Sequence, residues 1–228
     1  MKRFAIIVAG GSGQRMGSEL PKQFMPINGK PILFHTLSVF QKAIPDINLI
    51  LVLPKNEIDT WNQLCESEQM VFSVQIVAGG QTRFQSVDNG LKIIPNEDDI
   101  MVAVHDGVRP LVSATLIQKC FSEANFDTGI VPTTKLKESI VTANNLQMVD
   151  RENLRNVQTP QVFPAKYLKD AYEFCKILDP MGNEFTDDSS VFSKSGYRLK
   201  SVEGEYSNIK ITTPEDIIFA NALIRDKE

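Results

Sequence analysis

The 228-residue chain is long enough to bury a substantial core in one α/β domain, and its 42% hydrophobic and 23% charged residues are typical of globular proteins. Its formal net charge of −4 excludes a general attraction to nucleic acids or anionic membranes, so any phosphate must be held by a local arrangement. The cysteines Cys65, Cys120 and Cys175 lack the spacing of a disulfide framework or a zinc site, so we expect a reduced, cytoplasmic chain.

The first predicted element is a buried strand at Phe4–Val8. This apolar run is shorter than the roughly 7–15 residues of a signal-peptide core, and it leads into glycines rather than a cleavage site. No later run approaches the roughly 18 apolar residues of a membrane span.

Strand and helix patterns then alternate through most of the chain. Buried strands are predicted at Phe4–Val8, Leu49–Leu53, Val74–Val77, Met101–Val104 and Gly129–Val131. Apolar residues recur at helical intervals in Pro31–Ala43, Ile58–Glu68, Arg83–Ile93 and Ala114–Ala124. This alternation predicts βαβ units in one domain over residues 1–228, with a mostly parallel sheet and helices on both of its faces.

The pattern changes in residues 135–155, which are polar and contain a turn signal at Asn144-Asn145. Two short β-compatible pieces flank that turn, so we expect a β-hairpin arm that projects from the domain. Helical patterning returns at Ala165–Lys176 and in Glu184–Ser195, where Thr186 or Asp187 is the expected cap. A last helix is expected to begin at Pro214, which suits a first turn.

Glycines follow directly after the first strand, in the segment Ala9-Gly10-Gly11-Ser12-Gly13-Gln14-Arg15-Met16. A bare backbone at a strand end can turn its N–H groups towards an anion, which favours a phosphate site over a simple flexible turn. The dinucleotide fingerprint GxGxxG fails because Met16 stands at the third glycine, and no Gly-Lys-[Ser/Thr] of a P-loop occurs. The loop therefore belongs to a different phosphate-binding class.

Two cations, Arg15 and Lys22, accompany this loop. Fixed positive charge there suits attack at a nucleotide α-phosphate, since negative charge grows on the phosphate oxygens and on the departing pyrophosphate. Taken singly, either side chain could be a solvated surface charge, but beside the glycines a catalytic role is favoured.

At this point the sequence resembles the cytidylyltransferases that act on 2-C-methyl-D-erythritol 4-phosphate in the non-mevalonate isoprenoid pathway. The resemblance covers nearly the whole chain and begins with the glycine loop and Pro21-Lys22-Gln23-Phe24. Later motifs, in order, are Gly79-Gly80 with Arg83 and Ser86, His105-Asp106-Gly107-Val108-Arg109-Pro110, Val149-Asp150-Arg151, Gln158-Thr159-Pro160-Gln161, Thr186-Asp187 and Asn208-Ile209-Lys210-Ile211-Thr212.

The resemblance implies a Rossmann-like nucleotidyltransferase fold and a reaction that joins CMP from CTP to a polyol phosphate, with Mg²⁺ held mainly by the CTP phosphates. Catalytic roles are implied for Arg15, Lys22, Arg151 and Lys210. Nucleotide contacts are implied for Ala9, Gly10, Gly11, Gly13, Gly80, Ser86 and Asp106. Contacts with the acceptor substrate are implied for Asp106, Arg109, Ser139, Arg151, Thr159 and Lys210.

The resemblance also implies a homodimer in which the 135–155 arm supplies Ser139 and Arg151 to the partner's site. Neither histidine is needed as a base: His35 is expected to pack in a helix, and His105 to support Asp106.

The acceptor has an alternative, because Ala9-Gly10-Gly11 is also typical of ribitol 5-phosphate cytidylyltransferases, and Ser139 stands where the methylerythritol enzymes usually carry threonine. Val149-Asp150-Arg151 favours the methylerythritol substrate. Two other hypotheses are a catalytically silent nucleotide-binding domain of this fold and a sugar-phosphate nucleotidyltransferase that uses UTP or GTP.

Overall fold

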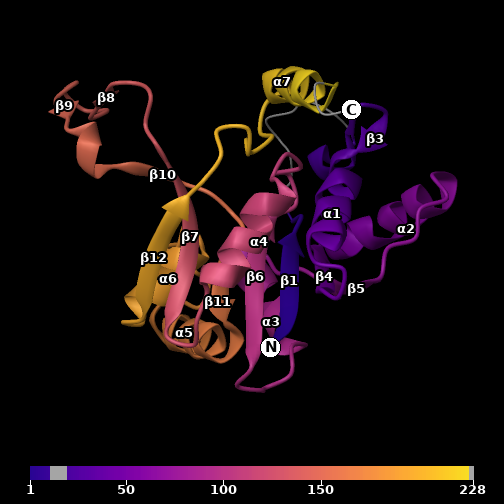
Figure 1. The fold of residues 1–228 in the computed structure, drawn as a ribbon, viewed down its shortest axis with the longest axis horizontal. Helices are drawn as coiled ribbons and strands as arrows, with labels where there is room; N and C mark the ends of the chain where they lie inside the picture. Colours follow the sequence, from indigo (N-terminus) through magenta and orange to yellow (C-terminus); the bar gives the residue numbers. More distant parts are fainter. Residues whose placement is uncertain (11–19, 226–228) are drawn as a thin grey trace.

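The computed structural model describes residues 1–10 and 20–225 and is built on an eight-stranded sheet (Figure 1). The strands of the sheet are β1 (Lys2–Val8), β4 (Asn48–Leu53), β5 (Val74–Ala78), β6 (Ile100–Asp106), β7 (Thr128–Lys135), β10 (Arg155–Val157), β11 (Gln161–Pro164) and β12 (Arg198–Glu203). Their order is β10-β7-β11-β6-β1-β4-β5, with β12 paired to β7. All five strands expected from the sequence are confirmed; four are one to three residues longer than their apolar runs, and β7 is five residues longer.

The sheet is mostly parallel around its centre. β1 runs parallel to both β4 and β6, β4 runs parallel to β5, and β12 runs parallel to β7. The chain passes from β1 to β4 and β5 on one side and then crosses to β6 on the other, so the order of connection reverses between β1 and β6. Ligands of open α/β sheets bind at such a reversal, beyond the carboxyl ends of the strands.

Helices cover both faces of the sheet, as predicted. One face carries α1 (Ile32–Ala43), α2 (Ile58–Ser67) and α4 (Ala114–Glu123), and the other carries α3 (Arg83–Lys92), α5 (Ala165–Leu178) and α6 (Asp188–Lys194). The last helix, α7 (Pro214–Arg225), lies at the edge of the sheet. Thr82 caps α3 through its side chain, and Asp187 caps α6 in a reciprocal pair with Ser190, which settles the choice between Thr186 and Asp187.

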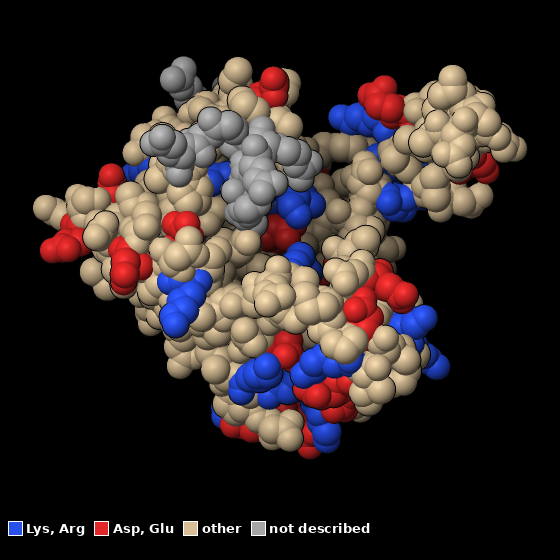
Figure 2. Space-filling view, turned by 180° about the vertical axis from the view of Figure 1, so that it is seen from behind, with Lys and Arg blue, Asp and Glu red and all other residues tan. Residues whose placement is uncertain are grey.

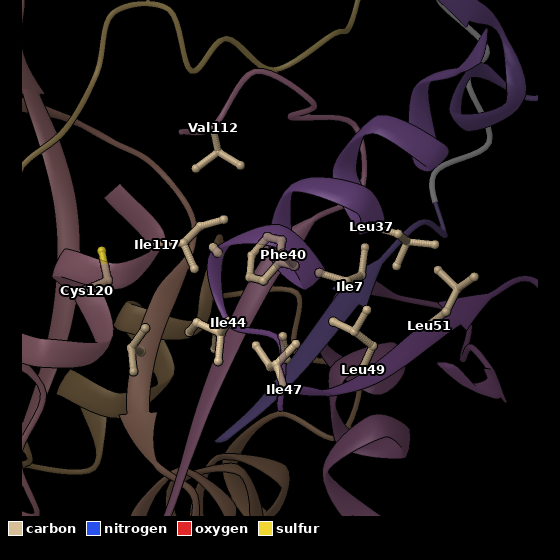
Figure 3. Packing of buried hydrophobic residues seen from close by; sticks show 14 of the residues in the cluster. Ile7, Leu37, Phe40, Ile44, Ile47, Leu49, Leu51, Val112, Ile117 and Cys120 are labelled. Carbon is tan, nitrogen blue, oxygen red and sulfur yellow. The ribbon is translucent and has the colours of Figure 1, made fainter. Parts of the chain in front are cut away.

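Two apolar layers fix these helices to the sheet. Ile7 of β1 packs on one face with Leu37 and Phe40 of α1 and with residues of α4 (Figure 3). Trp61 of α2 belongs to the same layer. Ile6, the neighbour of Ile7 in the strand, points to the opposite face and packs with α3, α5 and α6. Strands enclosed on both sides explain the uninterrupted apolar runs of the sequence.

Three strands of the sheet were missed by sequence reasoning. β11 runs antiparallel between β6 and β7, although it is bounded by Pro160 and Pro164, residues that argue against a central strand. β10 and β12 lie along β7 and are mostly exposed polar segments, so they carry no apolar signature. Their pairing comes from tertiary contact with β7, which local patterns do not encode.

The arm is present as a small hairpin of β8 (Ile140–Val141) and β9 (Met148–Val149), followed by a 3-10 turn, η4 (Arg151–Asn153). It leaves β7 at the carboxyl edge of the sheet and extends away from the domain (Figure 1).

A third, smaller apolar cluster lies at the same edge, where α7 meets the short strands β2 (Pro26–Ile27) and β3 (Lys30–Pro31). Ile211 is buried in this cluster, and its N–H donates to the carbonyl of Val108. This contact holds the 204–211 loop beside the end of β6. No helix in the described part of the chain is long and apolar enough to cross a membrane.

Candidate active site

The candidate site lies where β1 and β6 end side by side. β1 continues into Ala9 and Gly10, and β6 ends at Asp106, whose register partner in β1 is Val8. The N–H of Gly107 donates to the carbonyl of Val8, which keeps the two strand ends together. On the face shown in Figure 2, a hollow beside the root of the projecting arm exposes acidic atoms flanked by basic atoms.

A first cavity of about 180 Å³ opens beyond these strand ends. Its described lining consists of Val8, Ala9, Gly10, Lys22, Gln23, Gly80, Gln81, Thr82, Arg83, Ser86, Asp106, Val108 and Lys210. Lys22 begins the 3-10 turn η2 (Lys22–Phe24), whose Phe24 is buried in the core. Packing of that turn brings the lysine to the cavity.

The far wall of this cavity is backbone and hydroxyl, held by Ser86. Its Oγ accepts from the N–H of Gly80 at 3.1 Å and donates to the carbonyl of Thr82 at 2.8 Å. A Cβ on Gly80 would lie 2.3 Å from the Cβ of Gln85, so the close approach of this backbone to α3 requires glycine. The result is a wall of short polar groups suited to the edge of a planar ligand.

The near wall is organised by Asp106, whose side chain is 10% exposed and contacts three cations. Lys210 Nζ lies 3.0 Å and Arg109 Nε 3.2 Å from Oδ2, and Arg83 Nε lies 3.4 Å from Oδ1. Burial acts to raise the pKa of Asp106, but the charges of Arg83, Lys210 and Arg109 outweigh it and hold that pKa well below its usual range. Asp106 is therefore ionised at neutral pH and fixes three cations in place.

Behind Asp106 lies a buried support made by Thr159 and His105. The Thr159 hydroxyl accepts from the N–H of Asp106 at 3.1 Å and lies 3.0 Å from His105 Nδ1, and His105 Nε2 lies 3.1 Å from the carbonyl of Arg109. These partners fit a neutral ring with its proton on Nε2. Burial lowers the pKa of His105 to about 4, although the charge of Asp106 acts in the opposite direction. The expected support of Asp106 by His105 thus passes through the hydroxyl of Thr159.

A second cavity of about 210 Å³ adjoins the first. Arg83, Asp106 and Lys210 line both cavities, so these three side chains form a shared wall. The rest of the second lining is Arg109, Val157, Gln158, Thr159, Gln161, Thr186 and Asp187. Two ligands that occupy the two cavities would meet at Asp106.

The 204–211 loop carries Lys210 into this wall. Gln158 brackets the loop, because its Nε2 donates to the carbonyl of Glu205 while its Oε1 accepts from the N–H of the same residue. Asn208 is fully buried and donates to the carbonyl of Thr159, while Arg109 donates to the carbonyl of Asn208. These contacts hold the loop before Lys210, and the bond from the N–H of Ile211 to the carbonyl of Val108 holds it after Lys210.

The chain is similar to known proteins over almost its entire length. A sequence profile of the 2-C-methyl-D-erythritol 4-phosphate cytidylyltransferases matches residues 4–226. The enzyme of that name from Bacteroides fragilis is 46% identical over 226 residues, which cover 98% of this chain and 100% of that protein. The chain belongs to this family.

Solved structures agree with the cytidylyltransferase assignment. The 4-diphosphocytidyl-2C-methyl-D-erythritol synthase of Anaerococcus prevotii superimposes with a TM-score of 0.79 at 34% identity, covering 98% of this chain and 96% of that one. The 2-C-methyl-D-erythritol 4-phosphate cytidylyltransferase of Thermus thermophilus gives a TM-score of 0.80 at 28% identity, covering 99% and 100%. The expected Rossmann-like fold of this cytidylyltransferase family is confirmed.

The site residues predicted for a cytidylyltransferase fall into three groups. Around the two cavities the structure brings together Ala9, Gly10, Lys22, Gly80, Ser86, Asp106, Arg109, Thr159 and Lys210. Gly11, Gly13 and Arg15 lie outside the described residues. Ser139 and Arg151 lie in the arm, where Arg151 donates to the carbonyl of Lys137, and neither is among the residues that line the two cavities described above.

Arg83 is the site residue whose position sequence reasoning missed. Its motif was noted, but nothing in the spacing of Arg83 and Asp106 indicates that the two side chains meet at the shared wall. The cue available in the sequence was a cation at the first position of α3, three residues after the Gly79-Gly80 pair.

A metal cage is not formed by the described residues, among which no group of three or more His, Cys, Asp and Glu side chains is suited to a metal ion. Asp106 is already neutralised by three cations, and both carboxylate oxygens of Asp187 accept from α6 or from Gln161. The carboxylates of Asp106 and Asp187 are therefore already paired within the described part of the chain.

Proposed function

We propose that this chain transfers CMP from CTP to 2-C-methyl-D-erythritol 4-phosphate and releases pyrophosphate, as an enzyme of non-mevalonate isoprenoid synthesis. The observation that carries the proposal is the pair of adjoining cavities that share the wall of Arg83, Asp106 and Lys210. A reaction between a nucleotide and a second phosphorylated substrate needs two such compartments meeting at one point.

The nucleotide occupies the first cavity. Its cytosine faces the Gly80 backbone and Ser86, which line this cavity; the Ser86 hydroxyl oxygen and the Gly80 carbonyl are the acceptors offered to the base edge. The phosphates lie at Ala9 and Gly10, beside Lys22, where a fixed cation stabilises the charge that develops at the α-phosphate. Gly11, Gly13 and Arg15 belong to the same loop in sequence and extend this role.

The acceptor occupies the second cavity, where Arg109 and Lys210 offer positive charge to its phosphate and Thr159 lines the floor. Its hydroxyl oxygen forms a bond to the α-phosphorus while the bond to the pyrophosphate oxygen breaks, and its proton passes to solvent. Asp106 stays ionised throughout, so it orients the cations and the acceptor rather than taking up that proton.

The arm completes the neighbouring site in a homodimer. Its exposed apolar residues, which include Leu146 and Met148, suit burial against a second chain, and Ser139 and Arg151 reach the partner's acceptor. Mg²⁺ enters with CTP on its phosphate oxygens and supplies further charge neutralisation. Three free cysteines fit action in the reducing cytoplasm.

The proposal is tested by measuring pyrophosphate release from CTP and Mg²⁺ with 2-C-methyl-D-erythritol 4-phosphate or ribitol 5-phosphate as acceptor. Release with the first acceptor and a product mass equal to CMP plus acceptor are expected. UTP and GTP in place of CTP control for base choice. Pyrophosphate release with ribitol 5-phosphate but not with 2-C-methyl-D-erythritol 4-phosphate would overturn the proposed acceptor. The absence of pyrophosphate release with either acceptor would overturn the proposed activity.

A further inference from the structure

Behind the shared wall lies a fully buried carboxylate, Asp188, which lines neither cavity. Its Oδ2 accepts from Arg83 Nη2 at 2.6 Å, and its Oδ1 accepts from the hydroxyl of Tyr172 at 2.7 Å. Burying a carboxylate is unfavourable unless it is paired and hydrogen-bonded. Both conditions are met here, and the partner is the arginine of the site.

Arg83 therefore bridges two acids. Its Nη2 binds Asp188 in the interior, and its Nε faces Asp106 at the cavities, 3.4 Å from Oδ1. The charges of both acids raise the pKa of Arg83 against the opposing effect of burial. A planar guanidinium with one edge fixed in this way can point in only one direction.

Aromatic packing holds the inner end of this bridge. The ring of Phe84, next to Arg83 in α3, stacks on Tyr172 with centroids 4.5 Å apart and an interplanar angle of 18°. Burial, followed by the charge of Asp188, raises the pKa of Tyr172 well above its usual value, so its hydroxyl stays a donor to Asp188. Asp188 is also the first residue of α6, whose start is fixed by the Asp187 cap.

We propose that Asp188 is a positioning residue for the transfer reaction. By binding the inner edge of the Arg83 guanidinium, it orients that group toward the boundary between the two cavities, where the acceptor meets the α-phosphate. The proposal rests on the proposed function. A purely structural carboxylate would be better replaced by an apolar side chain, since buried ion pairs rarely add net stability. The site gains a cation whose direction is fixed before the substrates arrive.

The test is a double-mutant cycle with Arg83→Gln, Asp188→Asn and the double variant, each assayed for kcat and for the KM of both substrates. Asp188→Asn is expected to lower kcat/KM for the acceptor at least tenfold per folded molecule. The double variant is expected to lie within threefold of Arg83→Gln, because Asp188 acts only through that arginine. Asp88→Asn is the matched control: Asp88 is a largely buried acid paired with Lys92 and Lys176 away from both cavities, and it should keep wild-type kinetics.

Unaltered kinetics in Asp188→Asn, or losses that multiply in the double variant, would overturn the proposal. If Asp188→Asn does not fold, Tyr172→Phe decides, since it loosens Asp188 without removing a charge. That variant should lose at least threefold in acceptor kcat/KM, and the loss should vanish in the Arg83→Gln background. If Tyr172→Phe alone keeps wild-type kinetics, the proposal for Asp188 is contradicted. An inactive wild-type enzyme would instead refute the proposed function.

Discussion

At the scale of single residues, the chemistry of this chain depends on how charges are fixed before a ligand binds. Asp106 holds Arg83, Arg109 and Lys210 within 3.4 Å, and Thr159 and His105 hold Asp106 from behind. Preorganised charge of this kind lowers a barrier because no side chain must reorient during the reaction.

Lys22 is expected to act on the reaction rather than on the fold. Lys22→Ala should lower kcat by about 10²- to 10³-fold, the usual cost of losing one preorganised donor, with the unfolding transition unchanged. Steady-state kinetics with CTP and thermal unfolding measure both quantities. Lys55→Ala is the matched control, because Lys55 also begins a 3-10 turn after a proline but is exposed. A Lys22 variant that keeps more than about a tenth of wild-type kcat contradicts the assignment.

His105 is expected to make stability depend on pH. Its folded-state pKa of about 4 lies below the ordinary histidine value of 6.5, so the unfolded chain binds more protons between these two pH values. The free energy of unfolding should therefore fall as pH drops from about 6.5 to 4, by at most about 3 kcal/mol. Asp106, with its pKa well below the usual range, adds its own loss only at lower pH.

Urea unfolding across this range, with His105→Gln for comparison, measures the effect. In the His105→Gln variant the free energy of unfolding should change less with pH than in the wild type, whatever the absolute stability of the variant. Equal slopes in the two proteins would show that His105 does not titrate as its burial requires.

At the scale of elements, local patterns predicted what local forces determine. Doubly covered strands such as Leu49–Leu53 gave continuous apolar runs, and helices such as Ala114–Glu123 gave clear periodicity with a capping Ser113. β11 was not predicted because its prolines argue against a central strand. β12 was not predicted because it has a single buried side chain, Val202, and therefore no apolar pattern. Tertiary pairing decides such segments.

The arm is the element whose role is tested most simply. If it supplies Arg151 to a neighbouring site, Arg151→Ala should raise the acceptor KM or lower kcat at least tenfold while CTP affinity, measured by calorimetry, stays within about twofold. Arg198→Ala, an exposed arginine on the edge strand β12, is the control.

Mixing Arg151→Ala with Lys22→Ala should restore part of the activity, because each hybrid dimer contains one site with both side chains. A mixture no more active than the two separate variants would refute a site shared between subunits.

At the scale of the whole molecule, the sequence predicted the edge of the sheet at which the site lies, but not its two compartments. The glycines after the first strand and Asp106 at the end of another strand can both be recognised in the sequence. Because the carboxyl ends of parallel strands lie at the same edge of a sheet, these residues can be expected to lie close together. The shared wall also needs Arg83 from α3 and Lys210 from the 204–211 loop, which come from distant parts of the chain. Only the packed fold brings those side chains to one carboxylate.

A crystal structure with CTP bound tests the central claim most directly, because it places the nucleotide relative to the strand ends. We predict that the cytosine lies against Gly80 and Ser86, that the α-phosphate lies beside Gly10 and Lys22, and that the second cavity stays open to the acceptor. A triphosphate bound away from the end of β1, or a nucleotide that fills the second cavity, would contradict this account.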